Sequence, residues 1–159
     1  MKRTNVKTLT NAAIIASLYV VLTFIANSIG LASGAIQIRI SEALTILPVF
    51  TPAAIPGLFI GCLISNIIAG GVIWDIIFGS VATLLGALGT YSLRKYKWLA
   101  PLPPIIANAL IIPFVLIYAY GATEALPYLM VTVGIGEVIS AGILGMLLYS
   151  ALSKHKNIF

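Results

Sequence analysis

The chain has 159 residues, of which 60% are hydrophobic and only 8% are charged. A soluble domain needs about 25% charged residues to wet its surface, so this composition excludes a soluble enzyme and a disordered chain and indicates an integral membrane protein. One cysteine and one histidine exclude an internal disulfide, a multi-cysteine metal site and a Ser-His-Asp triad, and neither a metal nor a cofactor is expected.

Long windows without charged residues mark the membrane spans, since about 20 apolar residues cross a bilayer core of about 30 Å. The window 8–38 holds one span and a loop, and three prolines (Pro48, Pro52 and Pro56) interrupt the window 43–74 and predict a turn near Thr51. We therefore expect one all-α transmembrane domain over residues 1–159. Its six helices are predicted at roughly 8–28, 38–50, 53–71, 73–93, 101–121 and 125–152. The second is short for a full span.

Basic residues predict the orientation of these helices. Three clusters hold eight of the nine: Lys2, Arg3 and Lys7; Arg94, Lys95 and Lys97; Lys154 and Lys156. With six helices, all three clusters fall on one face, and the positive-inside rule predicts that this face and both termini are cytoplasmic. The first apolar run exceeds the 7–15 residues of a signal peptide, so we expect a retained span. Nucleic-acid binding is not expected, because the sequence shows no basic groove with interleaved aromatic residues.

A few polar residues interrupt the predicted helices and are expensive to place in lipid. The four ionisable ones are Arg39, Glu42, Asp75 and Glu137, and two amides lie in other helices, Asn66 and Asn108. Groups of this kind face protein, water or a ligand. The sequence therefore predicts that they converge on one polar, outward-facing pocket that binds a substrate.

Structural roles compete with substrate binding at several of these positions. Arg39 and Glu42 are three residues apart and can pair with each other. Asp75 can cap the helix that starts beside it, Trp74 can be an interfacial belt residue instead of a stacking platform, and Asn108 can join two helices. Glu137 has the fewest structural explanations, because it lies deep in a helix that carries no cation near it.

Small residues on the first helix give a flat strip, with Ala12 and Ala16 one turn apart. Such strips let helix backbones approach closely, either within the protein or against a partner. The chain lacks a G-x-x-x-x-G-K-[ST] phosphate loop, so it does not hydrolyse ATP by that route. A chain that has a substrate pocket but no site for ATP hydrolysis implies a partner that supplies the energy for transport.

Five segments of the sequence carry a resemblance to a known family: 38–45 (IRISEALT), 47–48 (LP), 56–57 (PG), 61–66 (GCLISN) and 74–80 (WDIIFGS). Together they resemble the QueT family, the queuosine-precursor substrate-binding (S) components of energy-coupling-factor (ECF) transporters. The resemblance implies a six-helix S-component bundle in the bacterial plasma membrane. It also implies partners, namely a membrane coupling subunit and two ATPase subunits. In the family an A-x-x-x-A strip on the first helix contacts the coupling subunit, and the resemblance implies this docking role for Ala12 and Ala16. It also implies a gating loop at about Ile29 to Gln37.

The implied substrates are 7-deazaguanines, whose guanine-like edge presents two N–H donors that a carboxylate accepts in bidentate fashion. On this basis we assign Glu137 and Glu42 to that edge and Asp75 to an aminomethyl cation. The base's O6 would accept from Arg39, Asn66 or Asn108, and Trp74 would stack on the ring.

Other functions remain open at this point. The chain is either an S component for a queuosine precursor, an S component for another vitamin or nucleobase, or a self-sufficient carrier with Glu137 as its proton relay. An enzyme is not expected, because no nucleophile–base pair appears in the sequence. A scaffold role would not explain why the predicted helices carry the ionisable residues Glu137 and Asp75.

Overall fold

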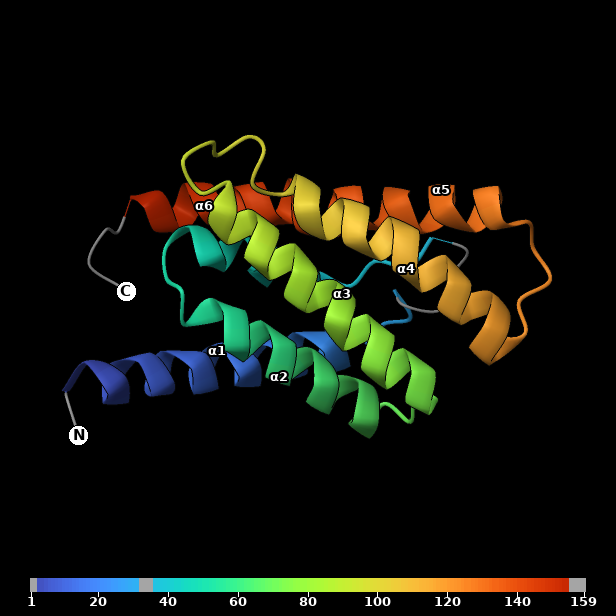
Figure 1. Cartoon of the computed structure of the whole chain (residues 1–159), viewed down its shortest axis with the longest axis horizontal. Helices are drawn as coiled ribbons and strands as arrows, with labels where there is room; N and C mark the ends of the chain where they lie inside the picture. The colour runs from blue at the N-terminus through green and yellow to red at the C-terminus, as the bar shows by residue number, and fades with distance from the viewer. Residues whose placement is uncertain (1–2, 32–35, 155–159) are drawn as a thin grey trace.

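The computed structural model describes residues 3–31 and 36–154, with side chains from Val6 onward, and within these ranges every regular element is helical. The first and last helices run along the long axis of the molecule, and the helices between them lie oblique to it (Figure 1). In chain order they are α1 (Arg3–Ser28), the 3-10 helix η1 (Ile40–Val49), α2 (Ala54–Ile68), α3 (Ile73–Ser92), α4 (Leu102–Tyr120), α5 (Leu126–Glu137), the π-helical segment η2 (Val138–Leu144) and α6 (Gly145–Ser153).

Helical structure is confirmed in all six predicted ranges, and the turn near Thr51 separates η1 from α2. Four stretches of the described chain are long and apolar enough to cross a membrane: Val6–Ser28, Ile73–Ser92, Leu102–Tyr120 and Leu126–Ser153. The other two, η1 and α2, are shorter. The start of α1, the end of α6 and the α3–α4 connection lie at one end of the molecule (Figure 1).

The second predicted helix differs from expectation, because it is wound as a 3-10 helix and not as an α-helix. Ten residues at a rise of about 2.0 Å span only about 20 Å, less than the bilayer core. Eight consecutive residues of η1, from Ser41 to Pro48, are buried. This short buried helix therefore begins inside the bundle, and Arg39, at its N-cap, lies within the protein.

The last predicted helix also has an irregular segment. Immediately after Glu137 the chain runs as a π-helix for seven residues before it resumes as α6. The π segment packs against η1, and the backbone N–H of Arg39 donates a 3.1 Å hydrogen bond to Ser140 Oγ. Because π segments often mark functional sites, the meeting of the two irregular helices points to this region of the bundle.

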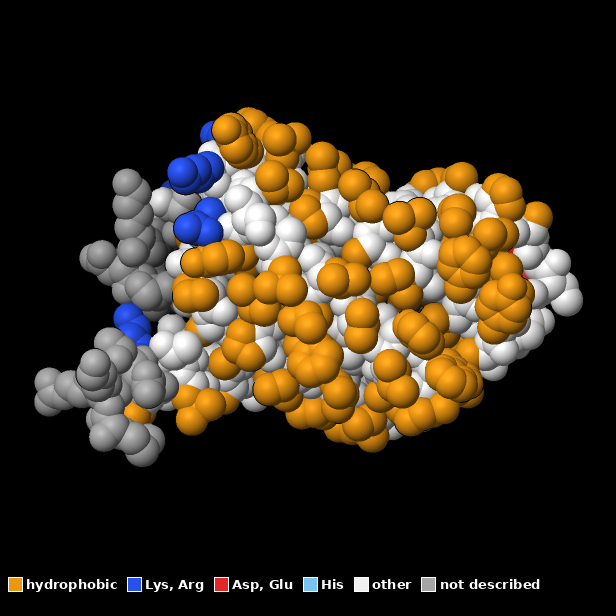
Figure 2. Space-filling model, viewed as in Figure 1, with side chains coloured by type: hydrophobic (Ala, Val, Ile, Leu, Met, Phe, Trp, Pro, Cys, Tyr) orange, Lys and Arg blue, Asp and Glu red, His pale blue; other side chains and the backbone are white. Residues whose placement is uncertain are grey.

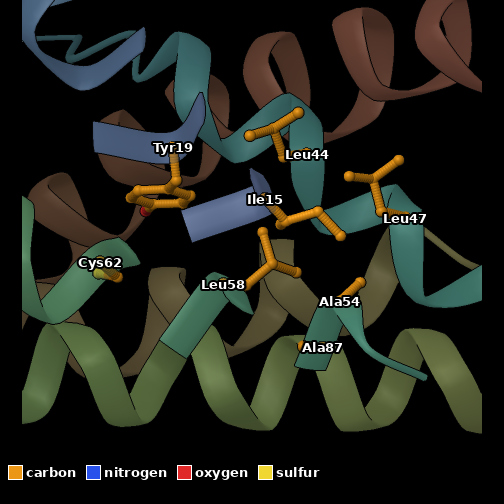
Figure 3. Packing of buried hydrophobic residues seen from close by; sticks show 8 residues of the cluster. All are labelled: Ile15, Tyr19, Leu44, Leu47, Ala54, Leu58, Cys62 and Ala87. Atoms are coloured by element: carbon orange, nitrogen blue, oxygen red, sulfur yellow. The ribbon is translucent and has the colours of Figure 1, made fainter. Parts of the chain in front are cut away.

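The apolar core joins α1, η1, α2 and α3, as the packed side chains in Figure 3 show. Glycines allow α2 to approach α1 closely. A Cβ atom at Gly57 would lie 2.7 Å from the carbonyl oxygen of Ala12, and one at Gly61 would lie 3.0 Å from that of Ala16. Ala12 and Ala16 are buried, so the small-residue strip of α1 faces α2 within the protein.

The distribution of polar and apolar side chains suits a protein surrounded by lipid. The outer surface is covered by large apolar side chains, whereas Lys and Arg gather at one end (Figure 2). The buried residues include many polar ones, among them Glu42, Asn66, Asp75, Asn108 and Glu137. An apolar exterior around a polar interior is the arrangement expected of a membrane protein with an internal site.

Candidate substrate site

Two chambers on either side of Gln37 and Arg39 form the polar cavity of the bundle. The larger chamber has a volume of about 260 Å³, and its polar lining comes from α1, the segment before η1, α2, α3 and α4. Its polar lining residues are Thr23, Asn27, Gln37, Arg39, Asn66, Asp75 and Tyr120. Three predicted substrate-binding residues, Arg39, Asn66 and Asp75, therefore share one hollow.

Asp75 is held by α4 and does not cap its own helix. The N-cap of α3 is Val72, and no side chain caps it. Instead, the hydroxyl of Tyr120 donates a 2.9 Å hydrogen bond to Asp75 Oδ2 and accepts one of 3.4 Å from the backbone N–H of Val72. Tyr120 thus joins the start of α3 to the end of α4, and both Tyr120 and Asp75 line the larger chamber. The amide of Asn66 donates to the Asp75 carbonyl at 3.5 Å.

The smaller chamber, of about 20 Å³, lies among Gln37, Arg39, Asn108 and Glu137. A volume of this size holds about one water molecule. Asn108 Nδ2 and Glu137 Oε2 are both buried, and neither has a hydrogen-bond partner. A buried donor or acceptor without a hydrogen-bond partner costs about 1–3 kcal/mol of stability. A ligand that offers an acceptor to Asn108 and a donor to Glu137 would remove this cost.

Glu42 lies deeper than the cavity and lines neither chamber. The hydroxyl of Tyr19 in α1 donates to Glu42 Oε1, while Oε2 is the third buried polar atom without a partner in the described chain. Glu42 is therefore hydrogen-bonded to Tyr19, whereas pairing with Arg39 and direct contact with the ligand were the two interpretations that the sequence left open. Thr45 Oγ1 donates to the Glu42 carbonyl at 2.6 Å and stabilises the first turn of η1.

Gln37 separates the chambers because its backbone crosses α5 at a glycine. A Cβ atom at Gly136 would lie 2.2 Å from the Gln37 carbonyl oxygen, so only glycine lets the chain pass here. Glu137 is the next residue of the helix. The predicted gating loop includes residues 32–35, which lie outside the described residues, but Ile38 donates to the Leu31 carbonyl at 2.9 Å and closes its base.

Three other predicted site residues lie away from the polar cavity. Trp74 is 56% exposed and lines an apolar groove between α3 and α4. Ala12 and Ala16 face α2, so a partner reaches them only if α1 and α2 separate. Across the described ranges, no cluster of His, Cys, Asp or Glu side chains is arranged to hold a metal ion.

The sequence analysis missed two tyrosines that hold the acids in place, Tyr19 and Tyr120. Both lie in apolar windows, where a tyrosine counts as hydrophobic and its hydroxyl goes unnoticed. Ser140 was also missed, since a lone serine in a helix carries little information. The signal that identifies such residues is a buried acid in another helix that needs a donor.

Comparison with known proteins identifies the family of the chain. The model of the QueT transporter family matches residues 9–154, which is nearly the whole sequence. The chain belongs to the QueT transporter family. It is also 34% identical over 99 residues to a protein of Lactococcus lactis subsp. cremoris (strain MG1363) named queuosine precursor transporter QueT. That alignment covers 61% of this chain and 57% of the relative, so the chain spans little more than half the length of this curated QueT protein. No solved structure matches.

Proposed function

We propose that this QueT family member is the substrate-binding component of an ECF-type importer and that it takes up a queuosine precursor, a 7-deazaguanine. In this proposal the chain crosses the bacterial plasma membrane six times, with both termini in the cytoplasm. It works with a coupling subunit and two ATPase subunits and carries out no chemical reaction itself. The name of the Lactococcus relative and the segments shared with the family support the choice of substrate.

The observation that carries the proposal is the pair of open hydrogen-bonding atoms in the smaller chamber. Glu137 Oε2 lacks a donor and Asn108 Nδ2 lacks an acceptor. A guanine-like edge offers N–H donors beside a carbonyl oxygen, which is the matching pattern. The smaller chamber has room for about one water, so the ring would occupy the larger chamber and insert only this edge between Gln37 and Arg39.

The rest of the cavity suits the other groups of such a ligand. Asp75, at the wall of the larger chamber, would neutralise an aminomethyl cation, and its hydrogen bond from Tyr120 leaves Oδ1 for that contact. A charge-assisted hydrogen bond is worth about 1.5–3 kcal/mol. Glu42, which lines neither chamber and accepts a hydrogen bond from Tyr19, would have a positioning role and not a direct contact.

A self-sufficient carrier is the competing function, since the buried, partly unpaired Glu137 also suits a proton relay. Reconstitution in lipid vesicles separates the two. We expect no uptake of a radiolabelled 7-deazaguanine by the purified chain under a proton gradient, and uptake once the coupling subunit, the ATPases and ATP are added. Uptake driven by the gradient alone would contradict the coupled mechanism and favour the carrier.

A further inference from the structure

A second hollow lies at the end of the molecule where the basic residues gather. It is formed by the α3–α4 connection and by Tyr149 of α6 and has a volume of about 430 Å³. Its cationic lining residues are Arg94, Lys95 and Lys97. We call it the basic pocket, and it shares no residue with the polar cavity.

The charge of the basic pocket is not balanced by any acidic side chain. The chain has only four acidic residues, and three of them (Glu42, Asp75 and Glu137) lie in or beside the polar cavity. The fourth, Glu124, is in the α4–α5 connection, at the opposite end of the bundle (Figure 1). Three neighbouring cations with no acidic side chain beside them in the described part of the chain favour the binding of an anion.

Neutral partners fix two of these cations in place. Arg94 donates a 3.0 Å hydrogen bond to the Tyr91 carbonyl and lies over the Tyr91 ring, 4.1 Å from its centre. The Lys97 ammonium lies 5.3 Å from the centre of the Trp98 ring. These contacts hold the side chains without neutralising them, so their remaining N–H groups can bind an anion.

The connection itself is rigid enough to form a site. Successive turn hydrogen bonds run along it, including Tyr96 N–H to the Leu93 carbonyl at 2.8 Å and Leu99 N–H to the Tyr96 carbonyl at 2.9 Å. Thr90 Oγ1 donates to the carbonyl of the fully buried Ala100 at 2.8 Å and joins the connection to α3.

The position of the basic pocket decides which anion it suits. Two of its residues are exposed aromatic side chains, Tyr96 at 63% and Trp98 at 73%, and the exposed Leu99 lies beside them. Tyrosine and tryptophan favour the headgroup level of a bilayer, while the surface next to this end is apolar (Figure 2). A ligand that is anionic at one end and apolar at the other fits this boundary.

We propose that the basic pocket binds the phosphate headgroup of an anionic phospholipid, with an acyl chain packed along Trp98 and Leu99. Free inorganic phosphate has the same anionic chemistry but no apolar part, so the lipid is the favoured source. Each of the three cations is expected to strengthen binding about fivefold.

Trp98 provides the test, since the only other tryptophan is Trp74. In the Trp74→Phe protein, Trp98 fluorescence is measured in vesicles of phosphatidylcholine to which brominated phosphatidylglycerol or brominated phosphatidylcholine is added. We expect the brominated phosphatidylglycerol to quench at a clearly lower mole fraction. Arg94→Gln, Lys95→Gln and Lys97→Gln should each reduce this preference about fivefold, and the triple variant should abolish it.

Two controls make the outcome decisive. Lys7→Gln and Lys154→Gln remove one positive charge at the same end of the molecule but outside the basic pocket, and they should leave the preference unchanged. An equal loss in these variants would show general surface attraction and overturn the proposal. A preference that survives in the triple variant would also overturn it, as would competition by millimolar inorganic phosphate, which would identify a free-anion site.

Discussion

Two hollows of the bundle are lined by adjacent residues of α3 and differ in polarity. Trp74 lines the apolar groove, of about 590 Å³, with Phe78, Phe114 and Tyr118. Asp75 lines the larger chamber of the polar cavity, of about 260 Å³. The groove is the bigger of the two, but its exposed aromatic and aliphatic side chains need only acyl chains to cover them.

The difference shows that unmet hydrogen-bonding capacity identifies a ligand site better than size does. No atom of the apolar groove is among the buried polar atoms that lack a hydrogen-bond partner in the described chain, since its two polar side chains, Trp74 and Tyr118, are exposed. The polar cavity holds Asn108 Nδ2 and Glu137 Oε2 without partners, in a protein whose exterior is apolar. Variants that change one hollow and not the other sharpen this comparison.

The largest effect is expected at Glu137. Glu137→Gln keeps the shape of the side chain but loses the charge and presents an amide donor to the donors of the ligand. Loss of a charge-assisted hydrogen bond weakens binding about 10- to 150-fold, which calorimetry of a 7-deazaguanine with the purified protein measures. Glu124→Gln makes the same chemical change at an exposed position and should bind like the wild type. Equal affinities of the two variants would remove Glu137 from the site.

A smaller effect is expected where Gln37 crosses α5. In Gly136→Ala the new methyl group meets the Gln37 carbonyl oxygen at 2.2 Å, so the segment between the chambers has to move. We expect a loss of about 1–3 kcal/mol in stability and roughly tenfold weaker ligand binding, measured by thermal unfolding and calorimetry. Gly134→Ala on the same helix is the control, since its nearest neighbour is 3.8 Å away. If both variants bind equally well, the close crossing does not shape the site.

A modest effect is expected at the junction of α3 and α4. Tyr120→Phe removes the hydrogen bond to Asp75, which should lower the free energy of unfolding by about 0.5–1.5 kcal/mol and speed ligand dissociation several-fold. Tyr118→Phe, in the apolar groove and 83% exposed, tests the same loss of a hydroxyl on the other side of α4. Stopped-flow dissociation rates compare them, and identical rates would show that the Tyr120–Asp75 contact does not retain ligand.

The smallest effect is expected at Trp74. Because Trp74 lies in the apolar groove, Trp74→Leu should change the affinity for a 7-deazaguanine less than twofold in the same calorimetric assay. Stacking on the base, the role first assigned to this residue, is worth about 1–3 kcal/mol, or roughly 5- to 150-fold. A loss in that range would place Trp74 in the site and require α3 to turn when the ligand binds.

The sequence allowed the helical ranges to be predicted, since a charge-free window depends only on composition. It did not reveal that 40–49 is a 3-10 helix or that 138–144 is a π segment, because both depend on which backbone groups pair. Six polar residues were expected to converge on one pocket, since each is too polar for lipid. Arg39, Asn66 and Asp75 line the larger chamber, Asn108 and Glu137 line the smaller one, and Glu42 lines neither. Their tyrosine partners were not found, because hydropathy counts a tyrosine as apolar.

Helix orientation explains where the residue predictions and the structure diverge. Ala12 and Ala16 were assigned to a partner surface, yet they face Gly57 and Gly61 of α2. Gly57 and Gly61 are also four residues apart in the sequence, but spacing alone does not say which small-residue strips meet. The adjacent pair Trp74 and Asp75 shows the same limit, since one position along a helix changes the direction of a side chain by about 100°.

Selective retention of ligand tests the central claim most directly. The detergent-purified protein is incubated with an equimolar mixture of a 7-deazaguanine, thiamin and riboflavin, washed, denatured and analysed by mass spectrometry. We predict that the 7-deazaguanine is retained by the wild type and by Glu124→Gln and is lost from Glu137→Gln. Retention of thiamin or riboflavin instead, or equal retention of the 7-deazaguanine by Glu137→Gln, would contradict the account.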